Sequence, residues 1–197
     1  MAVDRTPVLK RCRSLGLEAG YLGIDKKSNR NKTNGNKKKS EYGNQLAEKQ
    51  KAKFIYGVLE KPFRNYFNKA SMMKGQTGEN LMIMLERRLD NVVFRLALAR
   101  TRKEARQMVD HKNVTVNGKV INVPGYEVKE GDVIAIRDKC KASQKYKDIQ
   151  EANAGRTVPE WLEGDLENLT GTVKTLPNRE QIDVPVNEML IVELYSK

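Results

Sequence analysis

The sequence is poor in the residues that build disulfide scaffolds, metal centres and membrane spans. Its 197 residues include two cysteines, Cys12 and Cys140, and one histidine, His111. Two thiols this far apart exclude a disulfide-rich scaffold and a metal-binding knuckle, and they fit a reducing compartment. No apolar run could cross a bilayer, and the N-terminus lacks the apolar core of a signal peptide. We therefore expect a soluble cytoplasmic protein with no metal and no other cofactor.

Acidic side chains are scarce in the first part of the chain. There are 37 Lys and Arg against 25 Asp and Glu, which gives a net charge of +12. Residues 1–75 carry 18 basic and 6 acidic side chains, residues 76–147 carry 15 and 9, and residues 148–197 carry 4 and 10. This distribution favours a polyanionic partner that contacts mainly the first three quarters of the chain.

Large apolar side chains are almost absent from residues 22–45. Lys, Asn, Ser and Gly dominate there, so the stretch cannot bury enough surface to offset the entropy lost on ordering. A solvated linker is one interpretation, and an arm that orders against phosphates is the other. The cations of such an arm are Lys26, Lys27, Arg30, Lys32, Lys37, Lys38 and Lys39. We predict a basic extended N-terminal arm over residues 1–45.

Helical periodicity follows the arm and predicts a helical domain over residues 46–86. One helix is expected over residues 45–56 with Gly57 as its C-cap, and Pro62 suits the first turn of a second helix that ends near Met73. The second helix carries four side chains on one face: Phe63, Tyr66, Phe67 and Ala70. This spacing favours core packing over base stacking.

A long apolar stripe, a capped helix and a hairpin come next. The stripe is formed by Leu81, Leu85, Leu89, Val92, Val93 and Leu96, with Arg87, Arg88 and Arg95 on or beside the polar face. Thr101 and Glu104 form a capping box at the start of the next helix, which is expected to end near His111. Asn117-Gly118 then suits a type I′ turn between two short strands.

These elements predict a compact module over residues 87–147, followed by an acidic segment over residues 148–197. The apolar run Met189-Leu190-Ile191-Val192 in that segment is expected to pack back onto the N-terminal helices. The predicted fold class is therefore α+β. A helical N-terminal domain, completed by the C-terminal tail, is joined to a helix-helix-hairpin module with a small antiparallel sheet.

Basic side chains gather at the start of the capped helix, where the helix dipole and free N–H groups favour an anion. They are Arg100, Arg102, Lys103 and Arg106. Guanidinium groups one turn apart can grip phosphate bidentately, and Lys112 and Lys119 extend the positive charge toward the hairpin. A solvated basic face is the alternative, but the combination with an Asn-Gly hairpin favours nucleic-acid binding.

Residues 85–136 resemble the S-four type of RNA-binding module. Its signature positions hold Arg102, Glu104, Ala105, Val109, Val116, Asn117, Gly118, Val120, Pro124, Val128, Gly131 and Asp132. Such modules also occur in pseudouridine synthases, tyrosyl-tRNA synthetases and heat-shock proteins, so the module alone implies structured RNA.

The flanks are similar to one family, the bacterial small-subunit ribosomal protein S-four family (the universal uS-four family). The similarity rests on PVLKRCRSLG, on SEYGNQLAEKQKAKFIYGVLEKPFRNYFNKA and on the C-terminal VNEMLIVELYSK. It implies a structural 30S protein that binds 16S ribosomal RNA at a junction of the 5′ domain early in assembly and contacts ribosomal protein S-five. It also implies a contribution to translational accuracy, and some members repress their own operon's mRNA.

Two departures limit the resemblance. Zinc-binding members carry four cysteines near the N-terminus, the first two spaced C-x-x-C, whereas Leu9 precedes Cys12 here and no further cysteine follows before Cys140. The zinc-free form is therefore expected. Many members carry a Pro-Gly-Gln-His-Gly loop where this chain has Asn34-Gly35-Asn36-Lys37-Lys38-Lys39, so the RNA contacts of that loop are not carried over.

Two other functions are compatible with parts of the sequence. Arg88-Leu89-Asp90 is superficially similar to the catalytic motif of pseudouridine synthases, but the roughly 50 residues after the module are too few for a catalytic domain. Structural pairing of Asp90 with a nearby arginine is favoured, no catalytic residue is expected, and the chain is predicted not to be an enzyme. A free RNA chaperone or off-ribosome repressor is the second rival.

The complete set of candidate RNA-binding residues combines these cations with residues of the flanks. They are Lys10, Arg11, Arg13, Lys37, Lys38, Lys39, Lys49, Lys51, Lys53, Tyr56, Arg64, Arg88, Arg100, Arg102, Lys103, Arg106, Lys112, Asn117 and Lys119.

Overall fold

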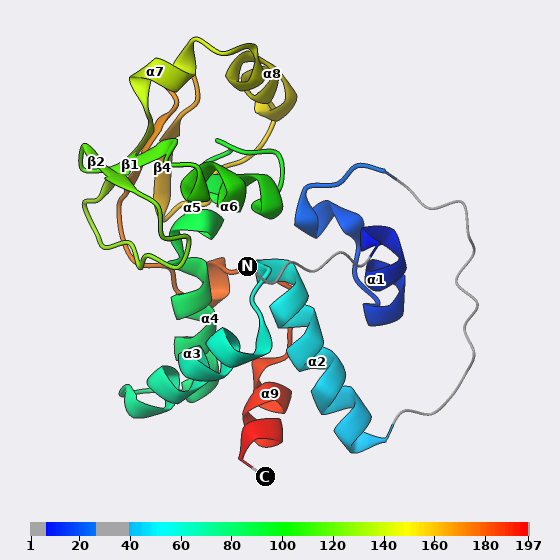
Figure 1. Cartoon of the computed structure of the whole chain (residues 1–197). Helices are drawn as coiled ribbons and strands as arrows, with labels where there is room; N and C mark the ends of the chain where they lie inside the picture. The colour runs from blue at the N-terminus through cyan, green and yellow to red at the C-terminus, as the bar shows by residue number, and fades with distance from the viewer. Residues whose placement is uncertain (1–6, 27–39, 197) are drawn as a thin grey trace. The chain divides into compact units, whose positions relative to one another are not determined.

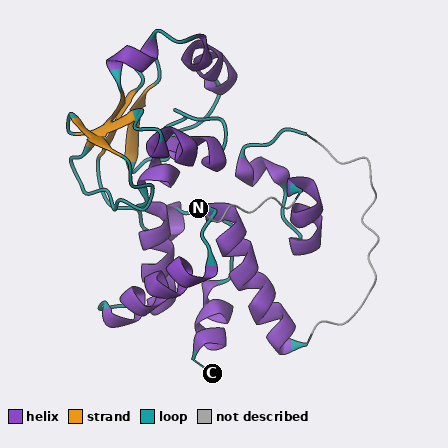
Figure 2. Cartoon of the chain, viewed as in Figure 1, coloured by secondary structure: helices purple, strands orange, loops and turns teal. Residues whose placement is uncertain are grey.

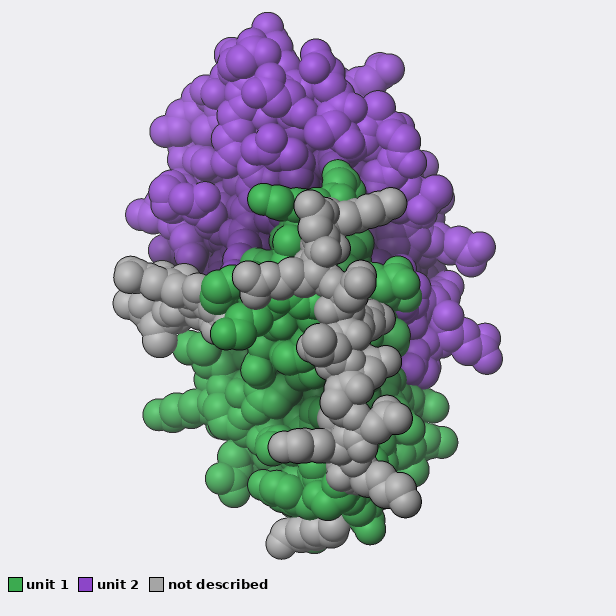
Figure 3. Space-filling model, turned by 90° about the vertical axis from the view of Figure 1, so that its right-hand side faces the viewer, with its two compact units in different colours: residues 1–81, 184–197 green, residues 82–183 purple. Residues whose placement is uncertain are grey.

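The computed structural model describes residues 7–26 and 40–196 and divides into two compact units (Figure 3). Unit 1 comprises residues 1–81 and 184–197, and unit 2 comprises residues 82–183. The candidates Lys37, Lys38 and Lys39 lie outside the described residues. None of the helices in the described ranges is long and apolar enough to span a membrane.

Unit 1 is helical (Figure 1). Its elements are α1 (Val8–Leu15), the 3-10 turn η1 (Ala19–Leu22), α2 (Glu41–Tyr56), α3 (Glu60–Met72), the first half of α4 (Thr77–Glu86) and α9 (Glu188–Tyr195). Ser40 caps α2 by accepting a hydrogen bond from the N–H of Gly43, so this helix begins before the expected Gln45. Gly57 ends it in the left-handed conformation, with φ 63°, as predicted.

The core of unit 1 forms between α2, α3 and α9. Phe63 and Ala70 are fully buried, which confirms the core packing predicted for that face of α3. Phe67 stacks on Tyr195 of α9 with ring centroids 4.5 Å apart. Buried Gln45 of α2 donates a hydrogen bond to Glu193 of α9 at 3.0 Å. The last residues of the chain thus complete the helical unit.

The N-terminal arm is folded in part. Residues 8–15 are helical and residues 19–22 form a 3-10 turn, so the prediction of an extended arm over residues 1–45 is wrong for these two stretches. The physical reason is burial of four apolar side chains, each at most 8% exposed: Cys12, Leu15, Leu17 and Leu22.

Unit 2 combines helices with a sheet, and the α+β prediction is confirmed (Figure 2). It contains the rest of α4, then α5 (Leu89–Arg95), α6 (Arg102–Asp110), β1 (Val114–Val116), β2 (Lys119–Ile121), β3 (Val133–Ile136), α7 (Asp138–Lys141), α8 (Gln144–Asn153), β4 (Leu162–Asp165), β5 (Thr170–Val173) and the 3-10 turn η2 (Arg179–Gln181). The strands form one antiparallel sheet in the order β2-β1-β3-β5-β4. Its inward-facing side chains share one core with α5 and α6.

The hairpin turn and the end of α6 lie where the sequence predicts them. Asn117 and Gly118 adopt positive φ values of 50° and 76°, so the type I′ turn joins β1 and β2. Helix α6 ends at Asp110 with His111 as its C-cap. The apolar stripe before α6 is split, because Arg88 is extended (ψ 136°) and forms a β-bridge with Glu127 between α4 and α5.

Residues 148–183 belong to unit 2, so the prediction that all of residues 148–197 complete the helical domain is wrong for this part. Strand β5 pairs with β3, which places Val133 opposite Thr172, and β4 pairs with β5. Burial explains the placement, because Trp161, Leu162 and Leu169 enter the core beneath the sheet.

Candidate nucleic-acid interface

A capping arrangement fixes the N-terminus of α6. Thr101 Oγ1 accepts a hydrogen bond from the N–H of Glu104 at 3.1 Å, as predicted, and Glu104 Oε2 accepts one from the N–H of Arg100 at 2.9 Å. The guanidinium of Arg100 pairs with Glu104 at 3.2 Å, and Lys145 lies 3.7 Å from the same carboxylate. Partial burial opposes ionisation, but hydrogen bonds from Arg100 outweigh it and lower the pKa of Glu104. An ionised carboxylate therefore orders cations beside the helix start.

Arg106 combines exposure with an internal anchor. Its Nη1 lies 3.7 Å from Asp90 Oδ2, and its side chain is 37% exposed. Asp90 accepts two hydrogen bonds from Arg88, at 3.0 and 2.6 Å, and one from the N–H of Asn91. Because Asp90 is 4% exposed, its predicted structural pairing with a nearby arginine is confirmed. The exposed part of the Arg106 guanidinium can meet a phosphate.

Arg102 belongs to the interior of unit 2. The residue is 7% exposed, its Nε donates to Asn91 Oδ1 at 2.8 Å, and its guanidinium lies 4.3 Å from the centre of the Phe94 ring. Arg156, which no sequence pattern singles out, lies 4.2 Å from the centre of the same ring. Most of the Arg102 side chain is enclosed within unit 2, and the phosphate contact predicted for it stays a prediction.

Two of the arginines expected on or beside the polar face before α6 pair with carboxylates, Arg88 buried and Arg95 with a side chain 11% exposed. Arg88 is 4% exposed in its pair with Asp90, and its direct contact with RNA stays a prediction. Arg95 donates to Glu86 at 2.9 and 3.1 Å and to Asp183 at 2.6 Å. Burial alone would lower the pKa of Arg95, but the two carboxylates raise it, so the guanidinium stays charged. These pairs form a rigid polar frame beneath α6.

The hairpin turn uses the Asn117 side chain internally. Its Nδ2 donates to Asp132 Oδ1 at 2.8 Å, and its Oδ1 accepts from the N–H of Val133 at 2.9 Å. The amide that was expected to contact RNA thus fixes the turn. Lys119 is exposed beside this turn, Lys112 is exposed before the start of β1, and Lys103 is exposed on α6.

Candidates on α2 are mostly engaged within unit 1. Lys49 and Lys53 pair with Glu60 at 3.0 and 2.6 Å, and their side chains are 12% and 15% exposed. Lys51 pairs with Glu48 one turn away. Tyr56 is 3% exposed because it lies on the apolar face of α2, and its contact with RNA stays a prediction.

The remaining candidates of unit 1 reach its surface to different degrees. Lys10 on α1 and Arg64 on α3 are exposed, whereas Arg13 is half-buried. Arg11 is half-buried and donates a hydrogen bond to Gln50 at 3.0 Å.

The structure therefore brings a smaller set to the surface of unit 2 than the sequence suggests. Of the predicted cations of unit 2, Arg100, Lys103, Arg106, Lys112 and Lys119 are exposed or half-exposed. Lys145 joins them through the carboxylate of Glu104. Lys145 was missed because its link to Arg100 runs through Glu104 and depends on the fold. Within residues 7–26 and 40–196, no group of three potential metal ligands is found.

Two family models match consecutive parts of the chain. The S4 domain matches residues 87–134, and the ribosomal protein S4/S9 N-terminal domain matches residues 4–86. The two matched domains together define an RNA-binding protein of the ribosomal class.

Relatives named "Small ribosomal subunit protein uS4" match over the full length of both chains. The protein of Lachnoclostridium phytofermentans is 71% identical over 198 residues, that of Agathobacter rectalis 72% over 197, and that of Desulforamulus reducens 52% over 208, each covering 100% of this chain and of the relative. The chain belongs to the uS4 family of small ribosomal subunit proteins, which confirms the resemblance. It is a structural ribosomal protein and not an enzyme.

Proposed function

We propose that the chain binds 16S ribosomal RNA at a multi-helix junction of the 5′ domain and helps nucleate assembly of the small-subunit body. The observation that carries this proposal is the cation surface at the start of α6, where Arg100, Lys103 and Arg106 lie over a buried frame of arginines and carboxylates. The positive end of the helix dipole adds to their attraction for phosphate.

The buried frame supports this role by holding cations in place before RNA arrives. Arg106 is anchored by Asp90, which Arg88 and Asn91 hold in turn. A prearranged guanidinium loses less conformational entropy on binding than a free one, so more of its contact energy appears as affinity. Lys112, Lys119, Lys10 and Arg64 are proposed to add phosphate contacts from the surface, and the contacts of Lys37, Lys38 and Lys39 stay a prediction.

Footprinting on full-length 16S ribosomal RNA tests the proposal. Saturating protein is expected to protect backbone riboses at one junction of the 5′ domain, and Arg106→Gln is expected to weaken that protection. Lys174→Gln is the matched control, because Lys174 is also an exposed cation near a carboxylate, Glu163 at 3.5 Å. Diffuse protection without a discrete junction would contradict the proposal and favour a free RNA chaperone.

The family membership also supports three finer proposals: contact with ribosomal protein S-five, a contribution to translational accuracy, and repression of the operon's own mRNA. Cross-linking within assembled subunits tests the first, and stop-codon readthrough in cells that carry surface variants tests the second. A reporter fused to the operon leader tests the third. Unchanged reporter expression when the protein is overproduced would exclude repression while leaving ribosomal RNA binding intact.

A further inference from the structure

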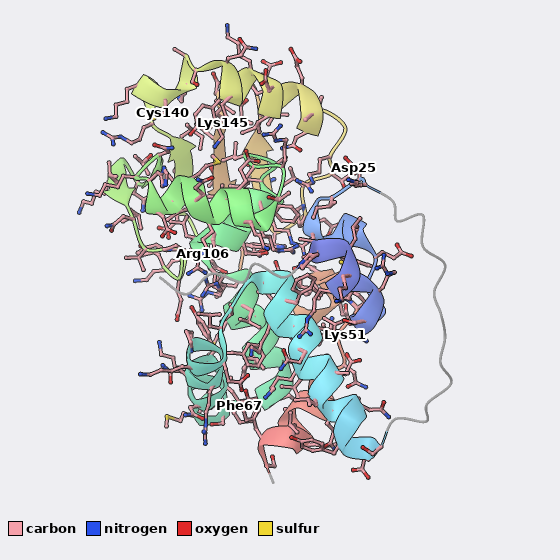
Figure 4. The ribbon with its side chains drawn as sticks, turned by 45° about the vertical axis from the view of Figure 1, so that its right-hand side comes forward. Asp25, Lys51, Phe67, Arg106, Cys140 and Lys145 are labelled. Carbon is pink, nitrogen blue, oxygen red and sulfur yellow. The ribbon has the colours of Figure 1, made fainter. Side chains whose placement is uncertain are left out.

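The outer face of α3 presents a surface that the α6 site does not include. Five exposed side chains recur along it at helical spacing: Lys61, Arg64, Asn65, Asn68 and Met72. Phe63, Phe67 and Ala70 point the other way and pack within unit 1. Figure 4 shows side chains projecting outward from α3, beside the labelled Phe67. From residue 61 to residue 72 the face is an ordered helix surface about 17 Å long, at 1.5 Å per residue.

No carboxylate of α3 balances the cations of this face. The helix has one acidic residue, Glu60, and its carboxylate accepts hydrogen bonds from Lys49 at 3.0 Å, Lys53 at 2.6 Å and the hydroxyl of Tyr195 at 2.9 Å. The negative charge of Glu60 is therefore neutralised on the α2 and α9 side of the helix. What the outer face presents is positive charge, complementary to a polyanion.

Helix α8 shows what an ordinary solvated face looks like in the same chain. Its exposed cation Lys147 stands beside the acidic residues Asp148 and Glu151, and Gln144 donates a hydrogen bond to Asp148 at 2.8 Å. Mixed charge of this kind keeps a surface soluble without selecting a partner. The single sign of charge on the α3 face is what distinguishes it.

The uncharged members of the face narrow the chemistry of the partner. Asn65 and Asn68 carry amides that both donate and accept, which suits ribose 2′-hydroxyls in the shallow minor groove of an RNA helix. Met72 is 86% exposed at the end of the stripe, where a thioether can lie against a ribose or an unstacked base. An acidic protein surface would match the cations but offers no repeated hydroxyl for both amides.

We infer that the outer face of α3 is a second RNA-contact surface, which meets the minor-groove side of an RNA helix. Lys61 and Arg64 contact phosphates, Asn65 and Asn68 contact 2′-hydroxyls, and Met72 packs at the end of the contact. The inference rests on the proposed function, because it assigns a further surface to the same RNA.

The test measures binding of full-length double variants to a 16S transcript between 50 and 200 mM salt. Lys61→Gln/Arg64→Gln should bind about tenfold more weakly and lower the salt slope by about two, since two phosphate contacts are lost. Asn65→Ala/Asn68→Ala should bind several-fold more weakly with an unchanged slope, because no charge is removed. The matched control, Lys139→Gln/Lys147→Gln, removes two exposed cations of unit 2 and should change affinity by less than about twofold.

Equal losses in the two charge-removing variants would show a general charge effect and overturn the inference, as would wild-type affinity in either α3 variant. Failure of the wild-type protein to bind the transcript would overturn the proposed function instead. Thermal unfolding of each variant shows whether it is folded.

A radical source tethered at Met72→Cys in a Cys140→Ser background locates the contact. Cys12 is 3% exposed, so labelling is directed to the new thiol. Discrete cleavage of 16S strands supports the inference, and absence of cleavage in a bound complex overturns it.

Discussion

At the scale of single residues, Asp90 serves two arginines in different ways. Arg88 and Asp90 are both about as buried as core residues, with side chains 5% exposed, and are joined by two hydrogen bonds. Arg106 approaches the same carboxylate at 3.7 Å while its side chain is 37% exposed. The pair of Arg88 and Asp90 therefore stabilises the fold, whereas the pair of Arg106 and Asp90 holds a guanidinium at the surface, where it can contact RNA.

Alanine substitution separates these two roles. Arg106→Ala should cost about 1–3 kcal/mol in RNA affinity and leave the unfolding temperature nearly unchanged. Arg88→Ala should lower the free energy of unfolding by about 3–5 kcal/mol, because it leaves a buried carboxylate without its main partner. Filter binding and urea unfolding measure the two effects. Unchanged affinity in a folded Arg106→Ala protein would make Arg106 part of an ordinary solvated face.

Gly171 in β5 lies where the neighbouring residues leave no room for a side chain. A Cβ added there would lie 2.7 Å from Leu96 Cδ1 and 3.0 Å from the backbone oxygen of Glu163. Leu96 is buried and the neighbouring strand is fixed by pairing, so Gly171→Ala should destabilise unit 2 by about 1–3 kcal/mol in urea unfolding. Gly155→Ala is the control, because a Cβ there meets no atom within 4 Å. Similar stabilities for the two variants would show that β5 shifts freely.

At the scale of elements, Glu60 joins three helices of unit 1. It receives hydrogen bonds from α2 through Lys49 and Lys53 and from α9 through Tyr195. Partial burial would raise the pKa of Glu60, but these hydrogen bonds outweigh it and lower the pKa from 4.5 to about 2. The unfolded chain therefore binds a proton at Glu60 at a higher pH than the folded chain does.

Because the folded chain favours ionised Glu60, its stability should depend on pH in the acid range. Stabilisation by Glu60 is fully present above pH 4.5 and is lost as the pH falls toward about 2. Glu60→Gln should remove this part of the acid sensitivity, so the difference in unfolding temperature between wild type and variant should shrink as the pH falls from 5 to 2. Glu163→Gln is the control, because that carboxylate is 67% exposed. A difference that stays constant with pH would contradict the role of Glu60.

Elements with local signals can be predicted from the sequence, and elements held by distant partners cannot. The Gly57 cap, the Thr101 cap and the Asn117-Gly118 turn depend on the chemistry of a few neighbouring residues. Strands β4 and β5 have the sequences LEGD and TGTV, which show little apolar alternation. Their stability comes from pairing with each other and with β3, so residues 148–183 were assigned to the wrong unit.

The candidate site shows the same difference between features set by neighbouring residues and features set by distant contacts. A cluster of cations near a capped helix is visible in the sequence, because all of its members lie within a few residues. The burial of Arg88 and Arg102 is not visible, since it depends on Asp90, Asn91 and the ring of Phe94. Sequence thus predicts that this helix start is basic, and the fold decides which of its arginines face outward.

At the scale of the whole molecule, charge is divided unequally between the two units. Unit 1 carries 19 basic and 9 acidic side chains, and unit 2 carries 18 and 16. The S4 domain match lies entirely in the nearly balanced unit, where carboxylates such as Glu86 and Asp90 neutralise arginines internally. Most of the net attraction for RNA phosphates must therefore come from unit 1.

Binding of the whole chain to 16S ribosomal RNA should consequently depend steeply on salt. If roughly six to ten phosphates are neutralised across both units, affinity should fall about 10³–10⁵-fold between 50 and 200 mM salt, by analogy with duplex DNA. Filter binding at constant pH measures the slope. An unrelated RNA of equal length is the control and should bind more weakly with a similar slope, because phosphate contacts carry no sequence information. An affinity for 16S RNA that does not change with salt would mean that shape and apolar contacts dominate binding. The +12 net charge would then not explain the affinity.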